Sequence, residues 1–164
     1  MNLEKLSHFA FVAACLFLMA VVIVRHTDRS QAPRAREVSS RGRILDHVRE
    51  VPFDRHDVTV YIVVSPGCPY CTDSLAFYDR VVTAAAGSTR SVQVIFASPA
   101  PTEVTAAYLT GNGVRLRSAV VGPVLIPVDG APTVLVIKRS GEVLAGWYGR
   151  MDRSQERALV KLVS

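Results

Sequence analysis

Apolar and polar residues alternate in blocks that predict an α/β domain over most of the chain. Apolar runs rich in β-branched residues predict buried strands at residues 58–64, 91–97, 133–137 and 143–149. Helical spacing covers residues 69–82, 102–111 and 152–163, and Gly87 is a stop signal after the first of these helices. The expected order is βαβαβ–ββα, a mixed central sheet flanked by helices on both faces.

The first 24 residues show a different pattern, because polar residues almost disappear. Residues 9–24 form an apolar run, and Leu6 extends it to about 19 residues, enough to span about 30 Å of hydrocarbon. A cleavable signal peptide needs a shorter apolar core and a small-residue cleavage site, which the sequence after Val24 lacks. We therefore predict that residues 1–24 form a single transmembrane anchor that contacts the lipid bilayer through residues 6–24. A helix buried in a soluble core is the alternative.

Cys15 follows Val12, Ala13 and Ala14, a sequence that resembles a bacterial lipobox. Lipoprotein processing needs the longer apolar run before the cysteine, whereas here it comes after. We therefore interpret Cys15 as an apolar membrane residue and not as a lipidation site.

Residues 25–45 are rich in Ser, Gln, Pro and Arg and have no apolar periodicity, which predicts a flexible basic linker before a domain at 46–164. The linker carries much of the positive charge of the chain, whose formal net charge is +5. No aromatic residue lies among its arginines, so single-stranded nucleic acid has no stacking platform there. We expect no nucleic-acid partner, and we expect the arginines to be solvated or to contact anionic lipid headgroups.

The chemistry of the chain is concentrated in Cys68-Pro69-Tyr70-Cys71, between a predicted strand and a predicted helix. The free N–H groups and positive dipole end of a helix N-terminus stabilise a thiolate, which is the nucleophilic form of cysteine. Pro69 suits the first helical position, which needs no N–H donor. We therefore expect Cys68 to attack and Cys71, one helical turn later, to resolve the mixed disulfide.

A second segment, "APTVLVIKRSGEVLAGWYG" at residues 131–149, is a proline-led strand, a turn and another strand. With the C-x-x-C about 60 residues upstream, it resembles the thioredoxin superfamily. The strand, helix and long connection before Pro132 are similar to the membrane-anchored TlpA/ResA-like branch, whereas the Pro-Tyr dipeptide of the motif is similar to glutaredoxins. The resemblance covers residues 58–164 and implies a thioredoxin-like fold with Pro132 beside Cys68 in the catalytic site. It also implies that the backbone of Ala131 pairs with an extended substrate, which Pro69, Tyr70 and Thr133 help to bind.

Two positions depart from the pattern of thioredoxin itself. Gly67 stands where thioredoxin has tryptophan, and Ile62 stands where it has a buried aspartate that moves the proton of the resolving thiol. Proton transfer at Cys71 would then depend on water, another acidic group or the substrate.

Other cysteine chemistries fit the sequence less well. A zinc site needs two further ligands, but all four histidines precede the C-x-x-C and there is no second cysteine pair. A copper site similar to the Sco family lacks a histidine near Pro132, and a peroxiredoxin motif would need proline at Tyr61. We expect no metal and no cofactor beyond a redox-active Cys68–Cys71 disulfide.

These features together predict a membrane-tethered thiol–disulfide oxidoreductase with protein disulfides or dithiols as substrates and an electron donor or acceptor as recycling partner. The alternative is a non-catalytic thioredoxin-fold module that docks a partner at the membrane. The resemblance implies a single-pass protein of the bacterial inner membrane with an extracytoplasmic redox domain. The arginines that follow the apolar run favour the opposite orientation. Whether the pair reduces or oxidises its substrates stays open.

Overall fold

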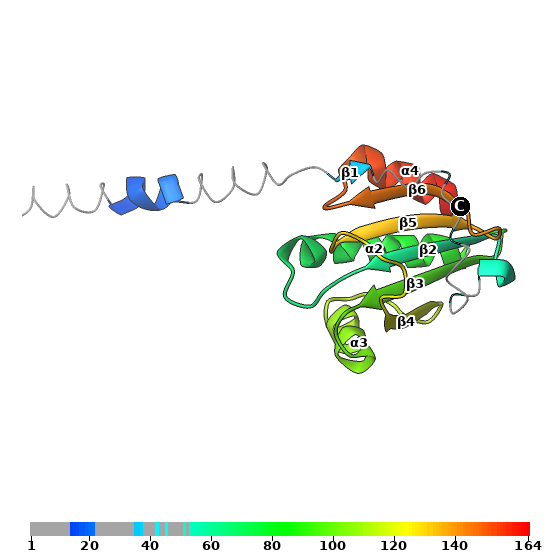
Figure 1. The fold of residues 1–164 in the computed structure, drawn as a ribbon. Helices are drawn as coiled ribbons and strands as arrows, with labels where there is room; N and C mark the ends of the chain where they lie inside the picture. Colours follow the sequence, from blue (N-terminus) through cyan, green and yellow to red (C-terminus); the bar gives the residue numbers. More distant parts are fainter. Residues whose placement is uncertain (1–13, 22–34, 38–41, 43–44, 46–50, 52) are drawn as a thin grey trace, which may run out of the picture. The chain divides into compact units, whose positions relative to one another are not determined.

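The computed structural model describes residues 14–21, 35–37, 42, 45, 51 and 53–164 (Figure 1). The chain divides into two units, Met1–Pro33 and Arg34–Ser164. In the first unit, residues 14–21 are helical, and the side chains of Leu16, Phe17, Leu18 and Met19 are 60–71% exposed. No helix within the described ranges has both the length and the apolarity needed to cross a bilayer. The anchor predicted over residues 6–24 falls largely outside those ranges.

The second unit is built on one six-stranded sheet in the order β1-β6-β5-β2-β3-β4 (Figure 1). The strands β2, β3 and β4 run parallel, whereas β5, β6 and β1 follow with antiparallel pairings. The strand bounds are β1 Arg36–Glu37, β2 Val58–Val63, β3 Val92–Ser98, β4 Ala119–Pro123, β5 Thr133–Lys138 and β6 Val143–Tyr148. The four central strands confirm the predicted apolar runs, and β4 supplies the remaining strand of the predicted order.

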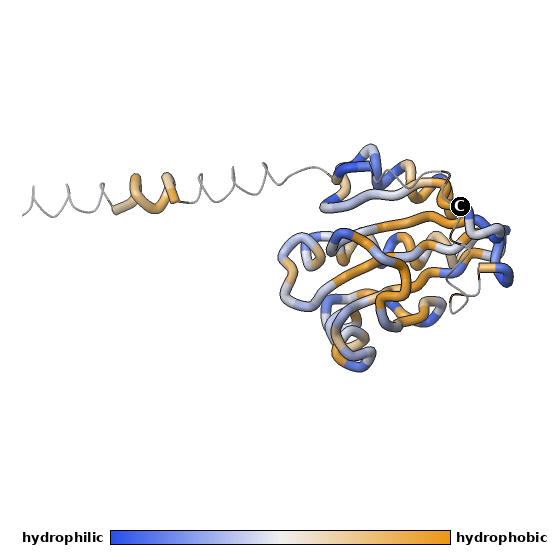
Figure 2. The backbone as a smooth tube through the Cα atoms, viewed as in Figure 1, coloured by the Kyte–Doolittle hydropathy of each residue, from blue (hydrophilic) through white to orange (hydrophobic). Residues whose placement is uncertain are grey.

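The central position of β2 explains why its sequence is apolar throughout. This strand pairs with β3 on one side and β5 on the other, and all six of its residues are buried. A strand covered on both faces reads as a continuous apolar run and not as an alternation. Figure 2 shows this apolar interior along the middle strands, with polar residues over the outer turns and helices.

Helices α2 (Pro69–Ala86), α3 (Thr102–Gly111) and α4 (Arg153–Val163) all contribute to one core cluster against one face of the sheet. The prediction of helices on both faces is therefore wrong for the α-helices of the described residues. The reason lies in the strand order. β3 lies beside β2 and β4 lies beside β3, so the two parallel connections cross the sheet in the same direction. Right-handed crossovers then place α2 and α3 on the same face.

The opposite face is covered by irregular chain and by the short 3-10 helix η1 (Phe53–Arg55). Val51, Phe53 and Ile126 pack there against alternate residues of the central strands. The buried hydroxyl of Tyr61 accepts a hydrogen bond from the backbone N–H of Leu125 (2.8 Å), which holds the connection after β4 on this face.

The N-terminal strand β1 pairs with β6, with Arg36 opposite Tyr148 and Glu37 opposite Trp147. Ala35, directly before it, is buried. These residues belong to the sheet although the composition of residues 25–45 predicts a linker. The pairing with β6, the hydrogen bond from the N–H of Ala35 to the carbonyl of Arg150 (2.8 Å) and the buried Ala35 methyl group hold this segment, and none of them leaves an apolar pattern in the sequence.

Candidate active site

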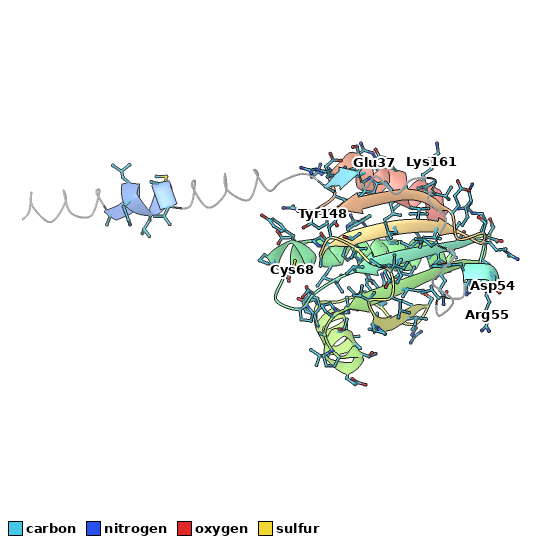
Figure 3. The ribbon with its side chains drawn as sticks, in the orientation of Figure 1. Glu37, Asp54, Arg55, Cys68, Tyr148 and Lys161 are labelled. Atoms are coloured by element: carbon cyan, nitrogen blue, oxygen red, sulfur yellow. The ribbon has the colours of Figure 1, made fainter. Side chains whose placement is uncertain are left out.

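The turn between β2 and α2 places Cys68 at the N-terminus of the helix. The chain turns through Gly67, whose φ of +84° lies in the left-handed region that favours glycine. The N–H of Cys68 then donates to the carbonyl of Ser65 (3.1 Å). Cys68 is the N-cap residue of α2 and Pro69 occupies the first turn, as the sequence predicts. Figure 3 shows Cys68 at this end of α2.

The two cysteines of the motif occupy different environments. The backbone N–H of Cys71 donates to the sulfur of Cys68 over 3.3 Å, so the Cys68 sulfur is the acceptor that caps the helix. Cys68 is half-buried, whereas Cys71 is fully buried. Burial raises the pKa of the Cys71 thiol to about 12, and the hydrogen bond with Cys68 is the second-largest cause of the rise. Cys68 is therefore the accessible sulfur, and Cys71 is held as a neutral thiol behind it.

The loop that contains Ala131, 63 residues after Cys68 in the sequence, lies against the Cys68 sulfur. The thiol of Cys68 donates to the carbonyl of Ala131 at 3.7 Å, and the peptide bond between Ala131 and Pro132 is cis. The N–H of Gly149 donates to the carbonyl of Pro132 (2.8 Å). The hydroxyl of Thr133 donates to the carbonyl of Gly130 (2.6 Å). Contacts on both sides of Pro132 thus fix the position of the Ala131 carbonyl next to the sulfur.

Two exposed aromatic side chains lie near the contact between Cys68 and Ala131. Tyr70 is 39% exposed and Tyr148 is 40% exposed. The ring of Tyr148 lies so close to Gly130 that a Cβ at that glycine would be 3.2 Å from the Tyr148 hydroxyl. Figure 3 shows Tyr148 and Cys68 at the same end of the sheet. Tyr70 and Tyr148 therefore form an exposed aromatic rim next to the Cys68 sulfur.

The structure brings together Cys68, Cys71, Ala131 and Pro132, with Pro69 and Tyr70 in the first turn of α2. Thr133 is 1% exposed and its hydroxyl donates to the carbonyl of Gly130 (2.6 Å), which shapes the loop. The substrate-binding role that the resemblance implies for Thr133 stays a prediction.

Ile62 is fully buried in the cluster beneath α2, so an apolar side chain does occupy the position at which thioredoxin carries an acid. The titratable neighbours of the two cysteines include Tyr78 and Tyr108. Burial raises the pKa of both phenols, so neither accepts a proton at neutral pH. No group of three or more His, Cys, Asp and Glu side chains suited to a metal ion occurs in the described part of the chain.

Two interactions near the motif had no signal in the sequence. The hydroxyls of Thr72 and Tyr108 lie 2.9 Å apart and join α3 to the first turns of α2. Arg150 lies 3.6 Å from the carboxylate of Asp73, which joins the chain after β6 to the same helix. Each pair is separated by more than 30 residues, so only the tertiary structure brings its members together.

No protein-family model matches the sequence, and no curated protein matches it significantly. Solved structures do share the fold. A protein of Chlorobium tepidum provisionally named thiol:disulfide interchange protein DsbE superposes with a TM-score of 0.54 and 17% identity, over 80% of this chain and 94% of that one. A protein of Neisseria meningitidis provisionally named thioredoxin gives 0.54 and 17%, over 80% and 88% of the two chains.

A DsbF homologue of Corynebacterium diphtheriae gives a TM-score of 0.50 at 14% identity, over 81% of this chain and 88% of that one. At these identities the likeness concerns the fold and carries no residue roles. The second unit of the chain, Arg34–Ser164, has a thioredoxin-like fold.

Proposed function

We propose that the protein is a membrane-tethered thiol–disulfide oxidoreductase that exchanges disulfides with protein substrates through Cys68 and Cys71. One observation supports this most directly. An accessible sulfur at a helix N-terminus lies 3.3 Å from the amide of the second cysteine and 3.7 Å from the carbonyl of Ala131. An amide donor and a helix N-terminus favour negative charge on a cysteine sulfur, which is what nucleophilic attack requires.

In the proposed reaction the Cys68 thiolate attacks one sulfur of a substrate disulfide. The substrate S–S bond breaks, a mixed disulfide forms, and the other substrate sulfur leaves and takes up a proton. Cys71 then loses its proton and attacks the Cys68 sulfur, which forms the Cys68–Cys71 disulfide and releases the second substrate thiol. The substrate gains two electrons and the protein loses two, and a redox partner restores the dithiol. The reverse sequence oxidises a substrate dithiol.

The substrate chain is proposed to bind across the rim in an extended form. The loop that carries the Ala131 carbonyl provides backbone groups for pairing, a mode of recognition known as β-augmentation. Pro69 and Tyr70, at the start of α2, would contact the side chains on either side of the substrate cysteine. No cofactor other than the cysteine pair is part of the proposal.

Serine variants of the three cysteines test this function. Exchange with a disulfide-bonded peptide, followed by mass spectrometry, should be lost in Cys68→Ser, because the attacking sulfur is missing. Cys71→Ser should accumulate a covalent adduct with the peptide, because nothing resolves the mixed disulfide. Cys15→Ser is the matched control and should retain full exchange. Retention of exchange by Cys68→Ser would show the assignment to be wrong.

The membrane tether is the second part of the proposal. The apolar run of residues 6–24 has the length of a transmembrane helix, and Leu16 to Met19 expose apolar side chains in the described helical segment. The proposed location is the bacterial inner membrane, with the redox unit outside the cytoplasm. Cell fractionation tests the tether, and labelling of Cys68 in intact spheroplasts by a membrane-impermeant maleimide tests the orientation. Labelling only after lysis would place the unit in the cytoplasm.

One observation favours a second candidate, a non-catalytic module that docks a partner at the membrane. The buried Ile62 leaves Cys71 without a neighbouring carboxylate at the position where thioredoxin has one. If this candidate is correct, turnover of any disulfide substrate by the wild-type protein will be no faster than that of Cys68→Ser.

A further inference from the structure

One peptide group of α2 connects the Cys68 sulfur with a buried side chain in the next turn of the helix. The N–H of this group belongs to Cys71 and donates to the Cys68 sulfur over 3.3 Å. The carbonyl of the same group belongs to Tyr70 and accepts from the hydroxyl of Ser74 at 2.8 Å. In a helix the N–H of a peptide group points toward the N-terminus and its carbonyl toward the C-terminus, so both bonds form together. Ser74 is therefore linked to the reactive sulfur through a single peptide group.

Burial separates Ser74 from the two threonines of α2, whose hydroxyls also donate to a carbonyl one turn earlier. Thr83 and Thr72 make such bonds at 2.8 and 3.3 Å, and both residues are exposed. The carbonyl that Thr72 contacts is that of Cys68, and its peptide group ends at Pro69, which has no N–H. Of these three hydroxyls, only that of Ser74 contacts a peptide group whose N–H reaches the sulfur.

A second buried hydroxyl holds that of Ser74 in this orientation. The phenol of Tyr78, one turn further along α2, forms a side-chain hydrogen bond with Ser74. Burial raises the pKa of Tyr78, and the contact with Ser74 opposes the rise. The phenol therefore keeps its proton at neutral pH. It acts as the donor to the Ser74 oxygen, because the single proton of Ser74 is already directed at the Tyr70 carbonyl.

The strength of the Cys71 N–H as a donor matters for the Cys68 thiolate. The carbonyl of Ala131 accepts from the protonated thiol at 3.7 Å, and as an acceptor it cannot stabilise the thiolate. A hydrogen bond to a carbonyl polarises the peptide group and strengthens donation by its N–H, by about 10–30% per bond. Hydrogen bonds are also stronger where water is excluded, and Ser74 is 6% exposed.

We propose that Ser74 is a positioning residue for the attacking sulfur, because its hydroxyl polarises the peptide group between Tyr70 and Cys71 and so stabilises the Cys68 thiolate. Ser74 acts here in the first step of the proposed exchange reaction, on which this inference rests. A stabilised thiolate makes up a larger share of the protein when the pH is low. The Ser74 hydroxyl should therefore matter most at acidic pH, and little where cysteine thiols are ionised without help.

Alkylation by iodoacetamide tests this without any disulfide substrate. The full chain carries Cys15→Ser and Cys71→Ser, so that only the Cys68 sulfur displaces iodide and forms a thioether. The substitution at Cys71 keeps the backbone N–H that donates to Cys68.

Other titratable and charged groups around the motif stay the same in every protein compared. They are Tyr70, Asp73, Tyr78, Tyr108, Tyr148 and Arg150. Burial raises the pKa of Tyr78 and of Tyr108, so both phenols are neutral at acidic and neutral pH. Removal of the Ser74 hydroxyl takes away a contact that lowers the pKa of Tyr78, so this phenol stays neutral in the variant as well.

At pH 6, Ser74→Ala should be alkylated about two- to fourfold more slowly than the parent protein, because the amide donor to the charged sulfur is weaker. At pH 9.5, above the ordinary range of cysteine thiols, the two rates should converge. Ser74→Thr keeps a hydroxyl that reaches the same carbonyl and should restore the rate at pH 6. Thr83→Ala is the matched control, since it removes the same kind of bond further along α2, and it should change neither rate.

An equal rate for Ser74→Ala and the parent protein at pH 6 would overturn the inference. A loss of the same size at both pH values would also overturn it, because that result indicates altered access to the sulfur and not an altered share of thiolate. Exchange with a disulfide-bonded peptide is measured separately in the protein that retains Cys71. If that exchange were no faster than in Cys68→Ser, the proposed function would fail, whatever the alkylation rates of the Ser74 variants.

Discussion

The backbone N–H of Cys71 points to the sulfur of Cys68 across 3.3 Å, while the Cys71 thiol is itself withdrawn from solvent. One helical turn thus provides both a donor for the accessible sulfur and a protected position for the second one. Burial also raises the pKa of Cys71 to about 12, so the second thiol is kept neutral as well as inaccessible.

This pKa predicts a pH dependence of the stability of the reduced protein. In the unfolded chain the Cys71 thiol would titrate near about 8.5. Because the folded state favours the neutral thiol, its contribution to stability is complete below that pH and is lost as the pH rises toward about 12. Urea unfolding under reducing conditions at pH 7 and pH 10 should show the loss, on the order of 1 kcal/mol per pH unit above about 9.

The matched control for this measurement is Cys71→Ser, whose hydroxyl does not titrate in this range. Burial raises the pKa of Tyr78 in both proteins, and the part of that rise that comes from the charge on Cys71 is counted with Cys71 in the difference. The free energy of unfolding of the wild-type protein should therefore fall faster with pH than that of the variant. Parallel curves would contradict the buried, neutral thiol.

Thr133 is expected to position the loop that carries the Ala131 carbonyl. Thr133→Val removes the donor to Gly130, now 2.6 Å away, and leaves that carbonyl without its partner. The free energy of unfolding should fall by about 1–2 kcal/mol, and kcat for peptide exchange should fall several-fold while KM changes less. Thr133→Ser keeps the hydroxyl and should restore kcat. If the serine variant were as slow as the valine variant, the hydroxyl would have no positioning role.

The exposed rings of Tyr70 and Tyr148 are expected to bind the substrate chain. Replacement of either residue by alanine should raise KM for a peptide disulfide about fivefold, because a large contact area is lost. A small disulfide such as oxidised glutathione does not reach both rings, and its exchange should change little. Val120→Ala is the control, since Val120 is 49% exposed but lies on the edge strand β4. Unchanged KM in both tyrosine variants would exclude the rim as a binding surface.

The ion pair between Asp79 and Arg115 is expected to stabilise the packing of α2 against the chain after α3. Two guanidinium contacts of 3.0 and 2.6 Å and a backbone N–H donor at 3.0 Å surround the carboxylate. The hydrogen bond from Arg115 lowers the pKa of Asp79, so this contribution is present at neutral pH and is lost as the pH falls below about 4. Asp79→Asn should cost about 0.5–1 kcal/mol at pH 7 and progressively less as the pH falls below about 4.

Glu142→Gln provides the comparison for Asp79. Its carboxylate pairs with Lys138 at 2.8 Å through a single contact between two exposed side chains. We expect this substitution to change the free energy of unfolding by less than about 0.5 kcal/mol at pH 7. If both substitutions lowered the free energy of unfolding equally, the several contacts of Asp79 would stabilise the protein no more than a single exposed ion pair does.

The strongly patterned parts of the fold could be predicted from the sequence. The β2 and β5 runs are apolar at nearly every position because both strands are covered on both faces. The helix after Cys68 was also predicted, since its N-cap position and Pro69 mark its start. The placement of Pro132 beside Cys68 was expected from the resemblance to thioredoxins, whereas the hydrogen bond from Cys68 to the Ala131 carbonyl was not predicted.

The remaining features have no local pattern. β4 contains Gly122 and Pro123, residues that are unfavourable in strands, and β1 consists of two polar residues, so neither has the pattern of a strand. The burial of Thr133 follows from its hydrogen bond to Gly130, which depends on the shape of the loop and not on residue type. The distribution of the helices depends on the strand order, which a single sequence does not specify.

The pairing of β1 with β6 also determines where a soluble fragment can begin. A fragment starting at Asp46 would lose Ala35 and both residues of β1, and with them the cover over the outer edge of β6. An uncovered edge strand is a template for pairing with other molecules, which leads to aggregation or domain swapping. Residues 35–37 therefore protect the outer edge of the sheet, and a monomeric fragment must retain the chain from Arg34 onward.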